Sequence, residues 1–332
     1  MPTDNRLRQV IVIPRNGYVN RLQAWASTAI LADDIGVEYG VMWEPEAVAP
    51  AFDLDLFDPS LVQNRFVSGE TVTDIVGRPH AELPRYLTLD KARDVLILAG
   101  HDRGEQIFMD PLRELLEGPQ CPTTLVIIAG GKFALGSTAN FRHRRGEFYR
   151  GITWNSSITT RVQRVLQDRG PHYGLHIRGT DRSRAAPTTR QVTRALHRLR
   201  DEGASRSLFV AADSAQARRR WTAIAENVGF QAWTADHDVR ARGERTAGHD
   251  AIVDWLALAA SITSTYSQTS TFGEEAAVAG GYLDDAIPLR ARRGVRAARD
   301  ARTLARALVT YPQRLLDRRA MIESGQESFP DP

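Results

Sequence analysis

The sequence alternates short apolar runs with longer amphipathic stretches, and this alternation limits the possible folds more than any other feature. Residues 9–14 (QVIVIP) are typical of a buried strand. Residues 20–36 have the apolar spacing of a helix, and Gly36 gives a stop signal. Because strands that alternate with helices form parallel sheets covered on both faces, we expect an α/β protein.

The other expected elements follow the same rhythm in both halves of the chain. Further strands are expected at residues 37–43, 93–100, 123–131, 172–177, 206–213, 230–235 and 262–267. Further helices are expected at residues 110–118, 188–203, 214–229, 248–261, 271–281 and 294–325. Residues 52–89 are interrupted by proline and show no clear pattern.

Two sets of alternating elements, with a break near residues 161–170, predict two doubly wound, Rossmann-like domains that face a cleft. We place the domains at residues 1–165 and 166–295. We expect residues 296–332 to form a helix that packs back on the first domain. In such folds, ligands bind beyond the carboxyl ends of the strands.

Composition excludes several classes of protein. Cys121 is the single cysteine, so a disulfide framework is excluded and a reducing compartment is expected. No apolar run approaches the roughly 18 residues of a membrane span, and the polar start lacks the apolar core of a signal peptide. We therefore expect a soluble, cytoplasmic protein. The net charge of +3 is too small to indicate nucleic-acid binding.

The stretch GLHIRGTDR, residues 174–182, ends an apolar strand with titratable side chains. His176 and Arg178 are two residues apart and therefore point to the same side of the strand. A histidine and an arginine fork that converge make a good anion site, and Asp181 follows in the loop. The alternative is an ion pair between Arg178 and Asp181 beside a core histidine.

A second cluster, STYSQTSTFGEEAAVAGG at residues 264–281, places hydroxyl side chains before an expected helix. A helix N-terminus carries unpaired N–H groups and partial positive charge, which together bind phosphate. Ser270 and Thr271 would add hydroxyl donors. The alternative is simple capping by Ser270, with Glu274 completing a capping box.

Two more positions are candidates. Asp254 stands on an otherwise apolar helix. A buried carboxylate needs donors, and a guanine edge offers two neighbouring N–H groups, although Asp254 could simply face solvent. In residues 15–23, Gly17 permits the turn from the first strand, and Asn20 and Arg21 project from the helix start. Capping of that helix by Asn20 is the alternative.

Other motifs fail. The chain has no P-loop, no nucleophile elbow and no pair of histidines with zincin spacing, so no metal site is expected. The Asp-x-Asp at residues 236–238 is too common a tripeptide to assign a metal. The arginines in residues 290–319 are interpreted as a solvated helix face.

Taken in order, these segments resemble the fucosyltransferase superfamily, which includes the α1,6-, plant xyloglucan and protein O-fucosyltransferases and the bacterial Nod-factor enzyme. The matching pieces are the Gly-x-x-Asn-Arg loop at residues 17–21, GLHIRGTD at 174–181, and IVDWLALAASITSTYSQTSTFGEEAAVAGG at 252–281. The resemblance implies a GT-B architecture, with an acceptor-side N-terminal domain and a nucleotide-sugar-binding C-terminal domain.

The same resemblance implies roles for individual residues. His176 and Arg178 would contact the pyrophosphate of the donor, and Asp254 would hold guanine. Ser270 and Thr271 would bind phosphate from the helix start. Gly17, Asn20 and Arg21 would line the cleft from the other domain.

The implied reaction is inverting sugar transfer without a metal or cofactor, from a nucleotide sugar such as GDP-fucose to a hydroxyl-bearing acceptor. Arg178 would stabilise the charge on the leaving diphosphate. For the base that deprotonates the acceptor, Glu44 is the first choice and Asp181 the second. Gly179 departs from several relatives, which have a second arginine there, and this leaves the donor sugar open.

Two other readings stay open. The chain could use another GDP-, UDP- or ADP-sugar in the same cleft. It could also be a non-catalytic protein that binds nucleic acid, although its arginines are scattered around helices without interleaved aromatic residues. We expect no membrane partner. The sequence does not identify the acceptor.

Overall fold

The computed structural model forms two compact units by internal packing. The first unit runs to Glu46 and continues from Ser60 to Arg145; the second takes Ala47–Pro59 and resumes at Gly146. The domain limits expected from the sequence stay predictions, and the helices expected at residues 110–118 and 294–325 lie outside the described part of the chain. The described residues are 7–79, 88–90, 92–99, 121–134, 140–178, 186–237, 244–268 and 270–290.

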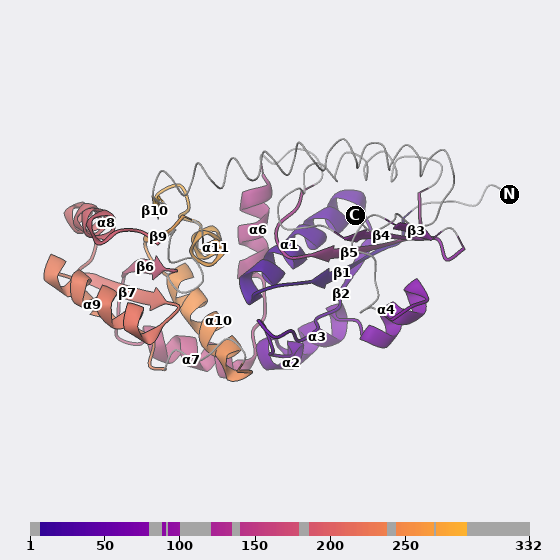
Figure 1. Cartoon of the computed structure of the whole chain (residues 1–332), viewed down its shortest axis with the longest axis horizontal. Helices are drawn as coiled ribbons and strands as arrows, with labels where there is room; N and C mark the ends of the chain where they lie inside the picture. Colours follow the sequence, from indigo (N-terminus) through magenta and orange to yellow (C-terminus); the bar gives the residue numbers. More distant parts are fainter. Residues whose placement is uncertain are drawn as a thin grey trace. The chain divides into compact units, whose positions relative to one another are not determined.

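A mostly parallel sheet forms the centre of the first unit (Figure 1). Its described strands are β1 (Gln9–Pro14), β2 (Glu38–Val41), β3 (Thr88–Asp90), β4 (Val95–Ala99) and β5 (Thr124–Ala129). They lie in the order β2-β1-β5-β4-β3. Among these strands only β3, at the edge of the sheet, is antiparallel, and it pairs with β4. The parallel sheet expected from the N-terminal half is therefore confirmed.

Helix α1 (Tyr18–Ile35) follows β1 and packs on the sheet, and Gly36 ends it in the left-handed conformation, as expected. Its start differs from the expectation. The helix begins at Tyr18, with Gly17 at the N-cap, so Asn20 lies in the first turn and does not cap it. A cluster of buried apolar side chains joins the strands of this sheet to α4 (Gly69–Val76) through Val72 and Val76.

Residues 52–89 contain short helices that the sequence pattern did not reveal. These are α2 (Asp53–Leu56), α3 (Pro59–Arg65) and α4. Helix α2 belongs to the second unit. Arg245 holds it there by donating from Nε and Nη2 to the two carboxylate oxygens of Asp55, each at 2.6 Å. Phe57 also stacks on Trp154, with ring centroids 5.4 Å apart.

The second unit has a wholly parallel sheet within the described residues. Its strands are β6 (Tyr173–Ile177), β7 (Ser207–Ala212), β8 (Gln231–Trp233), β9 (Ser264–Ser267) and β10 (Ile287–Leu289). Their order is β10-β9-β6-β7-β8. The chain therefore builds outward from β6 in one direction and then returns to its other side at β9. This reversal is the switch point at which doubly wound sheets bind ligands.

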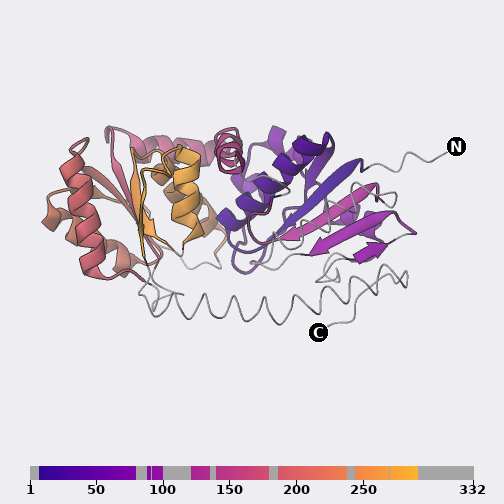
Figure 2. The same ribbon diagram turned by 90° about the horizontal axis from the view of Figure 1, so that it is seen from above.

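Helices cover both faces of this second sheet, as Figures 1 and 2 show. Helices α8 (Thr189–Glu202) and α9 (Ala215–Val228) lie on one face, and α10 (Thr246–Ala259) and α11 (Thr271–Gly280) lie on the other. The chain also forms α6 (Phe141–Arg150) and α7 (Ser156–Leu166), which the sequence analysis missed. No described helix is both long enough and apolar enough to cross a membrane.

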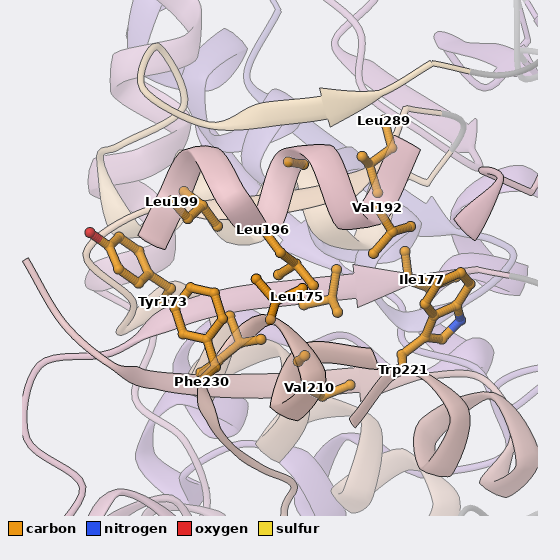
Figure 3. Close-up of a cluster of buried hydrophobic side chains, with 14 residues drawn as sticks. Tyr173, Leu175, Ile177, Val192, Leu196, Leu199, Val210, Trp221, Phe230 and Leu289 are labelled. Carbon is orange, nitrogen blue, oxygen red and sulfur yellow. The ribbon is translucent and has the colours of Figure 1, made fainter. Parts of the chain in front are cut away.

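The apolar core of the second unit lies between the sheet and helices α8 and α9 (Figure 3). Leu175 and Ile177 of β6 point into it and pack with residues such as Leu196 and Val210. Because side chains alternate along a strand, His176 points to the opposite face, toward α11. The core thus fixes the direction of the residues that end β6.

We expect Leu175→Ala to lower the free energy of unfolding by about 2–5 kcal/mol, because the fully buried side chain would leave a cavity. Urea denaturation measures this loss. Leu54→Ala, in the same unit but 54% exposed, is the control and should change stability by less than about 0.5 kcal/mol. Equal losses in the two variants would contradict the core assignment.

Candidate functional site

His176 lies in the interior of the second unit, where β6 approaches α11. Its side chain is 6% exposed and stacks on Phe272, with ring centroids 4.9 Å apart. Nδ1 has no hydrogen-bond partner among the described residues. Burial lowers the pKa of His176 to about 4; the charge of Arg178 acts in the same direction, while Asp213 opposes both. The imidazole is therefore neutral at pH 7 and carries no charge to an anion.

Arg178 is the first residue beyond β6, and its backbone is tied to the neighbouring strand. Its N–H donates to Oγ of Ser267, the last residue of β9, at 3.1 Å. This bond joins the carboxyl ends of β6 and β9 at the switch point. The guanidinium therefore starts from a fixed backbone at the position where such sheets bind ligands. Asp181, the expected alternative partner of Arg178, lies outside the described residues.

Helix α11 begins beside these strand ends, at Thr271. Ser270 takes the N-cap position, but its hydroxyl makes no cap hydrogen bond and is buried without a partner in the described part of the chain. The alternative of simple capping by Ser270 is therefore wrong, and no capping box with Glu274 forms. The first N–H groups of α11 and the Ser270 hydroxyl are not paired with each other.

Gly273 allows α11 to lie close to the sheet. A Cβ at this position would come within 2.5 Å of Tyr266 Cβ and 3.2 Å of His176 Nδ1. Any side chain would therefore push the helix away from β6 and β9. The sequence analysis did not single out this glycine, although a glycine in the first turn of a helix is the signal for such a close approach.

Asp254 is buried on α10, so the alternative that it faces solvent is wrong. Arg218 of α9 donates from Nη2 to Asp254 Oδ2 at 2.9 Å. The other oxygen, Oδ1, lies 3.4 Å from His237 Nε2 and makes no hydrogen bond among the described residues. Among the described residues, one oxygen of the Asp254 carboxylate is therefore hydrogen-bonded and the other is not.

A polar cavity of about 620 Å³, here called the β8 pocket, lies in the second unit, and its wall includes His237, the residue that approaches Asp254. It opens between the loop that follows β8, the start of α10, and α7. Its wall carries both hydrogen-bond donors and acceptors. The lining residues are Arg161, Thr234, Ala235, Asp236, His237, Thr246, His249 and Asp250.

In the first unit, the loop between β1 and α1 is held by a carboxylate that the sequence analysis missed. Glu46 Oε2 accepts from the backbone N–H of Asn16 at 3.0 Å, and its other oxygen pairs with Arg15 at 3.0 Å. Asn16 has a φ of 70°, which is uncommon for a residue other than glycine. The neighbouring Gly17 needs no such angle, with a φ of −67°. The loop is therefore held in an unusual backbone conformation.

Arg21 lies under this loop and is fully buried. Its Nε donates to Asn16 O at 2.9 Å, its Nη2 lies 3.2 Å from Glu46 Oε2, and its guanidinium stacks over Trp43. Burial lowers the pKa of the Arg21 guanidinium, and Glu46 opposes that shift. In the described structure the buried Arg21 side chain therefore supports the loop from the interior of the unit. Asn20, in the first turn of α1, is only half-buried.

Of the two candidate bases, only Glu44 lies within the described residues. Glu44 Oε2 lies 3.2 Å from Arg15 Nη1 and is 30% exposed, at the end of the segment that follows β2. Asp181 lies outside the described residues. No group of three or more His, Cys, Asp or Glu side chains that could hold a metal ion is present in the described ranges, which omit Asp238.

The expected site residues thus fall into two groups, one in each unit. His176, Arg178, Asp254, Ser270 and Thr271 gather at the carboxyl edge of the second sheet and at the helices that cover it. Gly17, Asn20 and Arg21 lie at the N-cap and the start of α1, and Glu44 lies in the segment that follows β2. The sequence analysis placed Ser267 in a hydroxyl cluster and His237 in the Asp-x-Asp tripeptide without a role for either, and it did not consider Arg218, because their roles depend on partners far away in the chain.

Comparison with solved structures finds the same architecture in other proteins. A mutant of FUT1 from Arabidopsis thaliana in complex with GDP matches with a TM-score of 0.60 at 14% identity, over 85% of this chain and 70% of that chain. POFUT1 in complex with GDP-fucose matches with a TM-score of 0.53 at 12% identity, over 87% and 97%. Fucosyltransferase NodZ from Bradyrhizobium matches with a TM-score of 0.52 at 20% identity, over 82% and 93%.

This chain has the fucosyltransferase fold. The GT-B architecture expected from the sequence is confirmed, as two α/β units that each contain a parallel sheet. At identities this low, the match is one of fold. No protein-family model and no curated protein matches the sequence. The fucosyltransferase fold therefore gives the setting, and the residues of the site must carry the argument about activity.

The buried, neutral His176 predicts a specific dependence of stability on pH. Its pKa falls from 6.5 to about 4 on folding, so its contribution is present above pH 6.5 and is lost as the pH drops toward 4. In the unchanged protein, protonation of His176 should lower the free energy of unfolding by on the order of 3 kcal/mol as the pH falls from 6.5 toward 4. We expect this pH-dependent loss to be absent from His176→Gln. Urea denaturation at a series of pH values measures it. Parallel curves for the two proteins would contradict the prediction.

Proposed function

We propose that this chain is a metal-independent, inverting glycosyltransferase that transfers fucose from GDP-fucose to a hydroxyl group of an acceptor. One observation carries the proposal. Arg178 and the start of α11 lie at the switch point of a sheet whose fold is shared with fucosyltransferases solved with GDP and GDP-fucose. The fold supports the reaction class, and the charged residues at the switch point support a diphosphate leaving group.

Positive charge at the switch point comes from two sources. The Arg178 guanidinium offers a planar fork of donors that suits phosphate oxygens. The first N–H groups of α11 add partial positive charge, and Ser270 does not cap them. Because His176 is neutral, its role is to hold α11 through Phe272 and to offer one hydrogen bond. Arg178 would therefore stabilise the negative charge that develops on the departing GDP.

The base of the donor would bind near Asp254. Asp254 Oδ1 is a buried acceptor without a hydrogen bond among the described residues, and the N–H groups of guanine are the donors it lacks. Arg218 neutralises the carboxylate through the other oxygen. The adjoining β8 pocket, at about 620 Å³, gives room for a nucleoside. These features support a guanine nucleotide over a donor whose base lacks such N–H groups.

The chemical step would be a single displacement at the anomeric carbon. The acceptor oxygen bonds to that carbon as the bond to the diphosphate oxygen breaks, and the hydroxyl proton passes to a carboxylate base. Glu44 remains the first choice for that base and Asp181 the second. Gly17 and Asn20, which follow the loop that Glu46 and Arg21 hold in place, remain proposed donor-binding residues.

We expect GDP to raise the melting temperature of the protein more than UDP or ADP does. A ligand at 100 times its dissociation constant adds roughly 2.7 kcal/mol to stability, which amounts to several degrees. Differential scanning fluorimetry with millimolar nucleotide measures the shift. A larger shift with UDP or ADP would point to another donor class, and no shift with any nucleotide would overturn the proposal.

We expect Arg178→Ala to reduce GDP release from GDP-fucose by at least about 100-fold, because the charge on the leaving group loses its main partner. GDP release reports transfer to any acceptor, including water. Arg178→Lys should also be slow, since a lysine cannot replace the bidentate fork.

The matched control is Arg198→Ala, on the exposed face of α8. It removes the same charge elsewhere in the unit and should leave GDP release unchanged. Arg198→Ala should melt within about two degrees of the unchanged protein, since a surface substitution alters stability by little, and the melting temperatures of the two Arg178 variants check that they keep the fold. Near-normal GDP release by Arg178→Ala would refute the role of Arg178.

A further inference from the structure

His237 lies on the wall of the β8 pocket, and its Nε2 lies 3.4 Å from Asp254 Oδ1. It follows the edge strand β8, and its place is fixed from two sides. Arg218 donates from Nη1 to the backbone oxygen of His237 at 2.9 Å, and Arg161 Nη2 lies 3.4 Å from its Nδ1. A side chain held through both its backbone and its ring is well suited to recognise a ligand.

The contact with Arg161 determines which ring nitrogen carries the hydrogen. A guanidinium has donors and no acceptor, so Nδ1 of His237 must accept the bond from Arg161. The hydrogen is then on Nε2. Arg161 is itself anchored by Asp250 of α10, at 2.5 Å from Nη2 to Oδ1, which keeps it in place to fix the tautomer.

The Nε2–H of His237 faces Asp254 Oδ1 at 3.4 Å, too far for a good hydrogen bond. The two groups therefore form a donor beside an acceptor, and neither satisfies the other. Asp254 is oriented by Arg218, which also holds the His237 backbone. One arginine thus sets the spacing between the donor and the acceptor.

We propose that His237 is a specificity-determining residue that donates to the 6-oxo group of the donor's purine while Asp254 accepts from N1–H. This inference rests on the proposed function. Guanine presents an acceptor at position 6 beside a donor at position 1, which matches the His237–Asp254 pair. Adenine presents the reverse, an amino donor beside an acceptor, and would set donor against donor and acceptor against acceptor. A site built this way rejects the mismatched base, because its buried groups would remain unpaired.

The test is isothermal titration of the full chain with GDP, IDP and ADP. IDP keeps the 6-oxo group and N1–H but lacks the 2-amino group. We expect His237→Ala to weaken GDP and IDP binding about equally, by roughly tenfold, and to leave ADP binding unchanged within about twofold. His237→Gln should recover part of the loss, because its amide N–H can take the place of Nε2–H.

The control is His197→Ala on α8, which lies on the opposite face of the sheet and should bind all three nucleotides as the unchanged protein does. If the unchanged protein binds GDP no better than ADP, both the proposed donor and this inference fall. If it prefers GDP and His237→Ala keeps the full preference, only the inference is overturned. Equal weakening of all three nucleotides would mean that His237 has a structural role, and would also overturn it.

Discussion

Helix α11 can lie against β6 and β9 only because Gly273 has no side chain, and most of the candidate site depends on that contact. The close approach stacks Phe272 on His176 and buries the imidazole. It also brings the start of α11 to the strand ends that Arg178 and Ser267 join. A positive helix end and a guanidinium thus meet at the switch point because one residue lacks a Cβ.

Neutralised carboxylates organise both groups of candidate residues. In the first unit, Glu46 holds the loop after β1 through Arg15, Arg21 and the backbone of Asn16. In the second unit, Arg218 neutralises Asp254 and fixes the chain at His237. In each case the carboxylate is paired with an arginine that is itself buried, Arg21 in the first unit and Arg218 in the second. Arg21 holds the backbone of Asn16, and Arg218 holds the backbone of His237.

The sequence predicted most of the architecture because its signals are local. The apolar strands and the glycines that end helices, such as Gly36 and Gly203, depend on neighbouring residues alone. Thr188 likewise caps α8 with Gln191, three residues further on. The short helices of residues 52–89 escaped detection because they are too brief to show a period. The strand order within each sheet depends on pairing between strands far apart in the chain, so the local sequence signals did not predict it.

The site was predictable by residue type and less so by environment. His176, Arg178 and Asp254 were identified from their positions at the end of a strand, just after it, and on an apolar helix. Their surroundings were not, because the Arg218–Asp254 contact joins residues 36 apart and the Arg161–His237 contact joins residues 76 apart. Ser270 shows the same limit. It stands where a capping serine belongs, yet its hydroxyl caps nothing, since the local rule describes a preference and packing decides the outcome.

The excursion of residues 47–59 into the second unit has a consequence for how the chain is made. Helix α2 leaves the ribosome early, but its partner Arg245 lies 190 residues later. Its other partners, Trp154 and Asn155, also come about 100 residues later, so the segment must wait for much of the second unit before it can dock. A fragment that begins at Gly146 would lack residues 47–59, which belong to the second unit.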